Sequence, residues 1–306
     1  MARFRTLKGF RADPRFGWAG PSEASRAWDE IGHLFPQFKI TGTRGKRAPG
    51  DRMMLWELVR KVLKKDTPNY PQEVGSCVAF GAKNAIEYIA CVEIFRGETE
   101  EFHQVFTPYL YGCGRVFVGR GQLRGDGSVG SWQAKAVEQF GTIRKDDPDV
   151  PAYNGKLERQ WGNPPGPPQT FVAKGKQNLI KTTSRINSWD ELKRAIINGY
   201  AVTIASDQGF EMQARKDGFH APSGAWSHQM CIVGVDNEPE DYACVLNSWG
   251  DVHGRLTDFH TQEKWPIGSI RARRAPIERM IRSGEAIAYS QFQGFPAQDL
   301  DFKKIF

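Results

Sequence analysis

The chain has 306 residues, of which 40% are hydrophobic and 25% are charged, and its formal net charge is +7. These values are ordinary for a globular protein that is long enough to bury an ample core. The sequence contains no run of eighteen apolar residues, which excludes a membrane-spanning helix, and no apolar segment follows the basic N-terminus, so we expect no secretory signal.

The positive charge is concentrated at the N-terminal end. Residues 1–70 hold 15 Lys and Arg against 7 Asp and Glu, a balance of +8, so the remaining 236 residues carry −1. Residues 1–50 predict a basic arm, largely extended, with one short helix near 23–31. Such an arm can dock on an acidic surface or an assembly partner, or it can be a solvated tail. No phosphate loop, helix-turn-helix or finger pattern accompanies it, so we expect neither a cofactor nor specific nucleic-acid recognition.

Residues 51–150 predict a helical lobe. From residue 51, apolar side chains recur at spacings of three and four residues, as in an amphipathic helix. A turn rich in Pro and Gly then leads into small and apolar residues from Cys77 to Ala90, which suits a buried central helix with Cys77 in its first turn. A glycine-rich loop over 112–130 comes before a further helix at 131–140.

Residues 151–290 predict a lobe rich in strands. A Pro-rich crossing segment occupies 145–178, and Ser188 with Glu191 forms a capping box that opens a helix ending near Asn198. Short β-like runs follow at 201–205, 229–235 and 242–247. Because helices come first and strands afterwards, the chain predicts an α+β protein with two lobes, followed by a C-terminal tail at 291–306.

The chain has five cysteines: Cys77, Cys91, Cys113, Cys231 and Cys244. Their odd number and scattered spacing argue against a disulfide framework, and the absence of a C-x-x-C pair argues against a structural metal site. At least one thiol must therefore be free unless two chains are cross-linked.

Three short segments carry the residues of a nucleophilic site: Gly75-Ser76-Cys77 at a helix start, Ser227-His228 at a strand, and Asn247-Ser248-Trp249-Gly250 at the end of another strand. A helix N-terminus and a nearby imidazolium both stabilise a thiolate, and the same imidazole can later protonate a leaving amine. An amide oxygen that accepts the other imidazole proton fixes the tautomer. Cys77, His228 and Asn247 are therefore the candidate catalytic residues.

Two further residues suit supporting roles. Trp249 can cover the hydrogen bond between His228 and Asn247 and keep water out. Gln72, five residues before Cys77, can point its amide N–H at a developing oxyanion, beside the backbone N–H of Cys77. Each residue also has a simpler interpretation: Cys77 as a small buried hydrophobe, His228 as a buried histidine, Asn247 as a turn cap. His220 is a rival to His228.

This set resembles the papain-like cysteine peptidases over roughly residues 65–255. The resemblance rests on Gln72 with Gly75–Phe80, on His228 with Gly234, and on Asn247–Gly250 with Gly254. It implies a helical lobe that carries Cys77, a β-barrel-like lobe that carries His228 and Asn247, and a polypeptide substrate between them. It also implies that the backbone of Gly125, Asp126 and Gly127 binds the substrate as an added strand would; Asp126 could equally be a turn former.

The chain departs from the family pattern at several positions. Val78 and His253 stand where the family commonly has Trp, Gln72 lies one residue closer to the nucleophile, and Val74 replaces a disulfide cysteine. The missing disulfide indicates an intracellular or virion-associated protein of viral or prokaryotic type. No long helical propeptide is evident in residues 1–50. Two alternatives stay open: an idle papain-like scaffold in a larger assembly such as a virion, and a peptidoglycan-cleaving Cys–His hydrolase.

Overall fold

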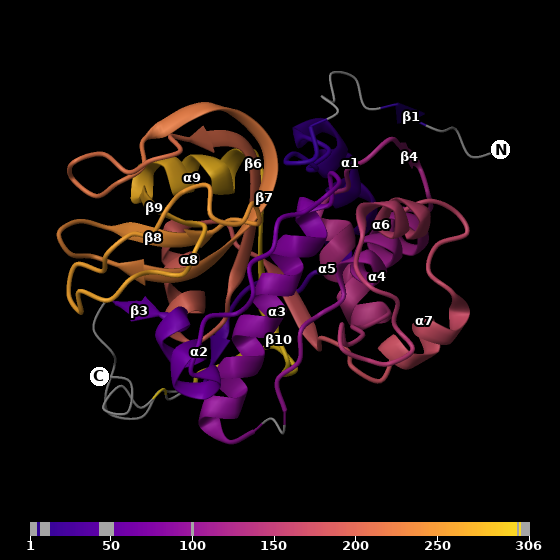
Figure 1. Cartoon of the computed structure of the whole chain (residues 1–306), viewed down its shortest axis with the longest axis horizontal. Coiled ribbons are helices and arrows are strands. Elements are labelled where there is room, and N and C mark those ends of the chain that lie inside the picture. Colours follow the sequence, from indigo (N-terminus) through magenta and orange to yellow (C-terminus); the bar gives the residue numbers. More distant parts are fainter. Residues whose placement is uncertain (1–4, 7–12, 43–51, 99–100, 299, 301–306) are drawn as a thin grey trace.

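The computed structural model describes residues 5–6, 13–42, 52–98, 101–298 and 300 (Figure 1). The predicted α+β fold with two lobes is confirmed: one lobe is helical, and the other is built on an antiparallel sheet. Most of the basic side chains of the arm (Arg3, Lys8, Arg11 and the cluster at 44–47) lie outside the described residues. The docking role of the arm therefore stays a prediction.

The helical lobe is built around one buried helix. This helix, α3 (Cys77–Arg96), is buried on nearly every face and ends at Gly97, which adopts the left-handed conformation with φ 80°. Small residues let it pack closely, since a side chain at Gly81 would lie 2.9 Å from the Gln229 amide of the sheet. The other helices before the crossing segment are α1 (Pro21–Ile31), α2 (Leu55–Leu63), α4 (Thr107–Gly112), a π-helix (Cys113–Val118) and α5 (Gly130–Gln139).

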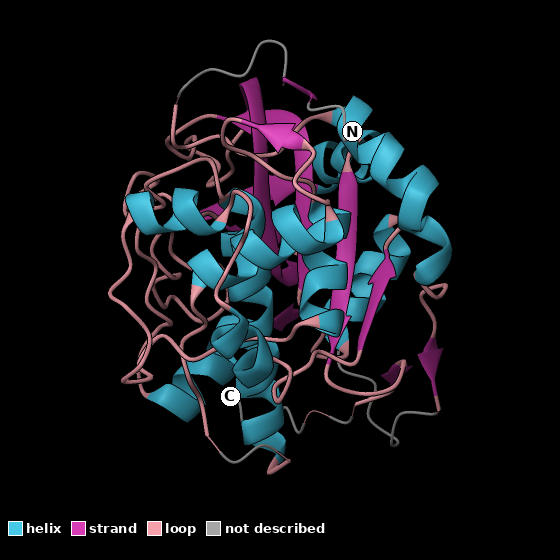
Figure 2. Ribbon diagram, turned by 90° about the vertical axis from the view of Figure 1, so that its right-hand side faces the viewer, coloured by secondary structure: helices cyan, strands magenta, loops and turns pink. Residues whose placement is uncertain are grey.

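The crossing segment predicted over 145–178 contains two short helices, α6 (Gly155–Trp161) and α7 (Gln169–Gly175). The predicted capping box forms: the Ser188 hydroxyl accepts the Glu191 amide at 3.1 Å and opens α8 (Trp189–Ile197). Together with α9 (Arg274–Ser283), α8 packs against the sheet. In Figure 2 the helical lobe faces the viewer and the long strands run behind it.

The main sheet has the strand order β5-β10-β6-β7-β8-β9, and β3 (Met53–Met54) pairs with β7. The strands are β5 (Thr182–Arg185), β6 (Val202–Phe210), β7 (Pro222–Asp236), β8 (Tyr242–Leu246), β9 (Ser269–Arg273) and β10 (Glu285–Ser290). Within the described chain β5 and β9 are its edges. The β-barrel-like lobe that the resemblance implied is thus an open sheet, and the described residues form no closed barrel.

Two pairs of short strands lie outside the main sheet. One pair joins β1 (Arg5–Thr6) to β4 (Leu123–Arg124), and the other joins β2 (Ile40–Thr41) to β11 (Phe295–Pro296); both are parallel. All five cysteines are buried and free. Among the residues that the structure describes, no helix combines the length and the apolar character needed to cross a membrane.

The two lobes meet where α3 packs against β7, and Figure 1 shows these two elements side by side at the centre of the molecule. The first residue of α3 is Cys77, His228 lies within β7, and Asn247 directly follows β8. Antiparallel pairing of β7 with β8 fixes the last two residues relative to each other. The fold thereby gathers the three segments that the sequence singled out.

Candidate active site

The Cys77 thiol lies at the N-terminus of α3 and is completely buried. Its sulfur accepts a hydrogen bond of 3.3 Å from the backbone amide of Gln229, the residue after His228. This contact joins the first turn of the central helix to the strand that carries the candidate base. The helix N-terminus contributes a partial positive charge at the sulfur, which favours the thiolate once water or a charged partner reaches it.

His228 and Asn247 form a direct pair. The Nε2 of His228 lies 2.7 Å from Oδ1 of Asn247, and the same oxygen accepts the backbone N–H of Ser248 at 2.7 Å. Since that oxygen can only accept, Nε2 of a neutral His228 carries the proton. The other ring nitrogen, Nδ1, is buried and has no hydrogen-bond partner in the described structure. It is therefore the basic atom of the ring.

Trp249 covers this pair on one side. Its ring centroid lies 4.6 Å from that of His228 at an interplanar angle of 38°, and Trp226 packs behind it at 4.7 Å. Trp249 is 5% exposed, so the rings leave little room for water beside the imidazole. This is the position expected for a shielding residue.

Gln72 lies on the helical side of the junction. Its Oε1 accepts a hydrogen bond of 2.8 Å from the Ser248 hydroxyl, so its Nε2 faces residues 13–19 of the N-terminal part of the chain. That Nε2 donates to the carbonyl oxygen of Pro14 at 2.7 Å and to that of Val74 at 3.1 Å. The amide expected to stabilise an oxyanion thus already binds a peptide carbonyl.

That carbonyl belongs to residues 13–19, which we call the covering segment. The amides of Gly17 and Trp18 both donate to the carbonyl of Ser227 at 3.0 Å, directly before His228. The approach is close: a side chain at Gly17 would lie 2.2 Å from the carbonyl oxygen of Gly75. Only a glycine fits between the segment and the turn that precedes Cys77.

The covering segment also pairs with the loop that precedes α5. Ser128 donates its amide to the Gly17 carbonyl and accepts the Ala19 amide, each at 2.8 Å, in a parallel bridge centred on Trp18. The strand-like contact thus falls on Ser128, one residue beyond the predicted loop Gly125-Asp126-Gly127. The backbone of the covering segment thus occupies the hydrogen-bonding groups of Ser128 with which an extended peptide could pair.

The predicted loop residues turn inward instead. Asp126 accepts a bidentate ion pair from Arg159 and lies 3.4 Å from the Gly75 amide. The Gly127 amide donates to the Tyr111 hydroxyl at 2.8 Å, and its carbonyl accepts Arg115 at 2.6 Å. Gly125 has φ 77°, which permits the turn. These contacts shape the loop that presents Ser128.

One side chain anchors the covering segment in the body of the protein. The Trp18 indole N–H donates to a carboxylate oxygen of Glu285 at 2.8 Å, and both residues are 1% exposed. The same carboxylate accepts the backbone amides of Gly130 and Ser131 at 2.7 and 2.9 Å, at the N-terminus of α5. Amide donors and the helix dipole satisfy this buried charge.

Burial keeps the thiol and the imidazole uncharged in this state. Desolvation raises the pKa of the Cys77 thiol to about 12 and lowers the pKa of His228 to about 3. Near neutral pH the pair is therefore a thiol and a neutral imidazole. Formation of a thiolate and an imidazolium requires the covering segment to leave, because solvent stabilises the charged forms.

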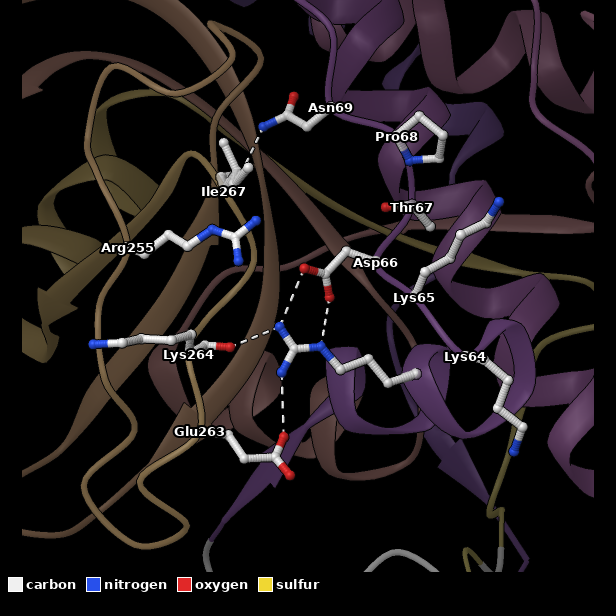
Figure 3. Close-up of a pocket in the computed structure, with 11 residues that line it drawn as sticks. Lys64, Lys65, Asp66, Thr67, Pro68, Asn69, Arg255, Glu263, Lys264 and Ile267 are labelled. Atoms are coloured by element: carbon white, nitrogen blue, oxygen red, sulfur yellow. Dashed lines mark hydrogen bonds and ion pairs between the residues drawn. The ribbon is translucent and has the colours of Figure 1, made fainter.

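The surface pocket drawn in Figure 3 is a separate feature, with a volume of about 630 Å³. Arg60 is one of the residues that line it and binds the Asp66 and Glu263 carboxylates and the Lys264 carbonyl. Neither Cys77 nor His228 lines it. We therefore place the candidate active site at the lobe junction and not in this pocket.

Several residues at the site escaped the sequence reasoning: the covering segment, Ser128, Glu285 and the contact of Asn247 with His253. A signal for the first was present, since Phe16-Gly17-Trp18-Ala19-Gly20 is an apolar, glycine-containing run inside a basic arm. Glu285 and Ser128 have no local signal. They matter because the fold brings them to Trp18.

Comparisons with known proteins identify the family and the fold. The family model described as papain family cysteine protease matches residues 67–264. A search of curated proteins gave no match. Two solved structures are similar over most of the chain. Xylellain, a cysteine protease from Xylella fastidiosa, has a TM-score of 0.54 at 15% identity, covering 92% of this chain and 98% of that one. Digestive procathepsin L 3 from Tenebrio molitor larval midgut has a TM-score of 0.52 at 15% identity, covering 86% and 79%.

A third structure, a ragweed pollen cysteine protease in its proform, has a TM-score of 0.53 at 16% identity and covers 80% of this chain and 66% of that one. At these identities the structures establish the fold. The family match spans well over half of the sequence and includes the helical nucleophile segment and both strand segments. The chain therefore belongs to the papain family of cysteine proteases and is a divergent cysteine peptidase.

Proposed function

We propose that the chain hydrolyses peptide bonds with Cys77 as nucleophile, His228 as base and acid, and Asn247 as the residue that orients the imidazole. One observation carries the proposal: Asn247 holds Nε2 of His228 at 2.7 Å and leaves Nδ1 unpartnered, while the next amide along β7 donates to the Cys77 sulfur. A base with a fixed tautomer is thus the neighbour in sequence of the amide that donates to a thiol at a helix N-terminus, which supports the proposed pairing.

In the first half of the reaction the thiol proton moves to Nδ1 of His228, and the thiolate attacks the substrate carbonyl carbon. The backbone N–H of Cys77 and the Nε2 of Gln72 donate to the resulting oxyanion. The imidazolium then gives its proton to the leaving amine, and a thioester with Cys77 remains. Water, deprotonated by the same imidazole, hydrolyses the thioester and regenerates the thiol.

The covering segment would hold this site idle. The Pro14 carbonyl accepts the Gln72 amide N–H, and the backbone at 17–19 bonds both the backbone N–H and the backbone carbonyl of Ser128. Phe16 and Gly17 lie against Gly75, in the turn before Cys77. A substrate needs the same contacts, so it cannot bind until the segment moves. Two of the similar structures were solved as precursors, a procathepsin and a proform. That agrees with an inhibitory role for part of residues 1–50.

Peptide hydrolysis by an opened full-length variant tests the proposal. Trp18→Ala removes the anchor to Glu285, and hydrogen exchange at the Gly17 and Ala19 amides reports whether the segment has left. We expect the opened protein to cleave denatured casein or a mixed peptide library, and we expect the double variant with Cys77→Ala to cleave neither. An opened, folded protein that cleaves no polypeptide would contradict the proposal.

A further inference from the structure

We propose that His253, held by the backbone carbonyl of Met212, is a positioning residue: it holds the Nδ2 end of the Asn247 amide and thereby keeps the Oδ1 end on Nε2 of His228. This inference rests on the proposed function, because it concerns how the proposed base obtains its tautomer. His253 occupies the position where the resemblance to the family leads one to expect a tryptophan. The positioning by a histidine is therefore a feature of this chain and is not implied by the family pattern.

The geometry is a continuous chain of buried polar groups. The side-chain amide nitrogen of Asn247 lies 2.8 Å from Nε2 of His253, and Nδ1 of His253 lies 3.3 Å from the carbonyl oxygen of Met212. Asn247 is fully buried, and His253 is 2% exposed. Solvent therefore cannot replace either contact without opening the lobe.

The Asn247 amide is held at both ends, at Oδ1 by its neighbour in the sequence and at the amide nitrogen by His253. The backbone N–H of Ser248 points at one atom of the amide at 2.7 Å, and a donor requires an acceptor there. That atom is Oδ1, so the atom facing His253 is Nδ2, which can only donate. Nε2 of His253 must accept, and the ring proton of a neutral His253 must lie on Nδ1.

The Met212 carbonyl completes the constraint, because a carbonyl oxygen can only accept. The Nδ1–H of His253 donates to the Met212 carbonyl, and Nε2 of His253 accepts from the Asn247 amide nitrogen. Oδ1 of Asn247 in turn accepts the Nε2–H of His228. Every donor points the same way along the chain. Its far end is the lone pair on Nδ1 of His228, the atom that takes the thiol proton.

The surroundings of His253 keep the ring neutral and in place. Trp226 and Trp249 flank it at centroid distances of 6.0 Å, and His220 meets it edge-on at 5.8 Å. Burial lowers the pKa of His253 to about 4, so the ring stays unprotonated near neutral pH. His220 does not compete for Asn247, because its Nδ1 accepts the backbone N–H of Arg271.

An indole at this position could not do the same work. Its nitrogen only donates, so it would face the donor Nδ2 of Asn247 without forming a bond. An imidazole both accepts from Asn247 and donates to Met212. Glutamine also carries an acceptor and a donor at the end of a side chain of similar reach, whereas leucine has neither.

The test compares His253→Gln with His253→Leu in the opened full-length protein. We expect His253→Leu to lower kcat by about tenfold or more while KM changes by less than about twofold. We expect His253→Gln to restore kcat to within about threefold of the parent. A folded His253→Leu protein with an unchanged kcat would overturn the inference, and so would a His253→Gln protein as impaired as the leucine variant.

A second measurement does not depend on catalysis. Nitrogen NMR of histidine-labelled full-length protein reports which nitrogen of His228 carries the proton. We expect Nε2–H alone in the parent and in His253→Gln, and a mixture of tautomers in His253→Leu. An unchanged tautomer in the leucine variant would refute the positioning role. If the tautomer changes as expected but no variant cleaves peptides, the proposed function fails and the positioning role stands.

Discussion

The proposed catalytic groups and the covering segment meet at one place but are built differently. Cys77, His228 and Asn247 are set by the start of a buried helix and by two paired strands, elements held by the core of both lobes. Residues 13–19 form no helix. They are held by a handful of backbone hydrogen bonds, by the side chains of Gln72 and Trp249, which donate to the Pro14 and Arg15 carbonyls, and by the Trp18 indole. Because the site rests on core elements and the segment on irregular backbone, substitutions can affect the two separately.

This difference between the proposed catalytic groups and the covering segment predicts opposite effects for substitutions in the two regions. A substitution that removes a catalytic group should abolish hydrolysis whether or not the segment is in place. A substitution that loosens the segment should raise hydrolysis and leave the chemistry intact. The predictions that follow use this difference, from the largest expected effect to the smallest.

Replacing the nucleophile should have the largest effect. Cys77→Ala in the Trp18→Ala background removes the thiol that accepts the Gln229 amide of β7, and we expect hydrolysis to fall by about a thousandfold or more. Initial rates on a denatured polypeptide measure the loss. Cys91→Ala, which removes another buried thiol of the same helix, is the matched control and should retain activity. Equal losses in both variants would show damage to the helix and would argue against a nucleophilic role.

Introducing a side chain at Gly17 should open the site. A Cβ at Gly17 would lie 2.2 Å from the Gly75 carbonyl oxygen, a distance that neither backbone can accommodate without moving. We expect Gly17→Val to raise the rate of peptide hydrolysis by about tenfold or more. Ser22→Val adds similar bulk on the exposed face of α1 and should change nothing. A Gly17→Val protein that stays as inactive as the parent, with exchange-protected segment amides, would contradict the account.

Removing one hydrogen bond of the anchor should have a smaller effect. Trp18→Phe keeps a large ring but loses the N–H that binds Glu285, and a hydrogen bond to a charged group contributes about 1.5–3 kcal/mol. We expect faster hydrogen exchange of the Ala19 amide and a correspondingly higher rate of hydrolysis. Trp28→Phe is the control, since the Trp28 indole N–H has no hydrogen-bond partner in the described structure. Equal effects of the two substitutions would show that ring packing alone holds the segment.

Acid should loosen the segment modestly. The closed state lowers the pKa of His228 from its ordinary value of 6.5 to about 3, so an open state binds a proton that the closed state does not. Closure is therefore strongest above pH 6.5 and weakens as the pH falls. We expect the open population to rise about threefold between pH 7 and pH 6. At lower pH the free energy of closure falls more steeply and approaches a loss of about 1.4 kcal/mol per pH unit. Exchange of the Gly17 amide, corrected for intrinsic rates, measures this, and a pH-independent population would contradict it.

The predictable parts of the molecule are those in which local pattern and long-range packing agree. Small residues after Cys77 indicated a buried helix, and α3 extends six residues beyond Ala90 to the glycine stop at Gly97. Ser188 and Glu191 indicated α8, and the apolar runs indicated β7 and β8. The open edges of the sheet could not be predicted, since strand order depends on pairings far apart in the sequence, such as β10 between β5 and β6.

The candidate site was predictable as a set of residue types and only partly as contacts. The spacing around Cys77, His228 and Asn247 indicated the candidate groups that the fold brings to the lobe junction, whereas the residue that pairs with the covering segment is Ser128, next to the loop that the resemblance indicated. Nothing local marks Glu285 as the partner of Trp18, 267 residues away. Partners of this kind are set by tertiary packing and become visible only in three dimensions.

The most direct measurement is the site and rate of labelling by a peptidyl epoxide, read by mass spectrometry in the parent and in Gly17→Val. The account predicts that the label is found on Cys77 and on none of the other four cysteines, and that Gly17→Val is labelled much faster than the parent. A folded Gly17→Val protein whose Cys77 stays unlabelled, or one that is labelled equally on another cysteine, would contradict it.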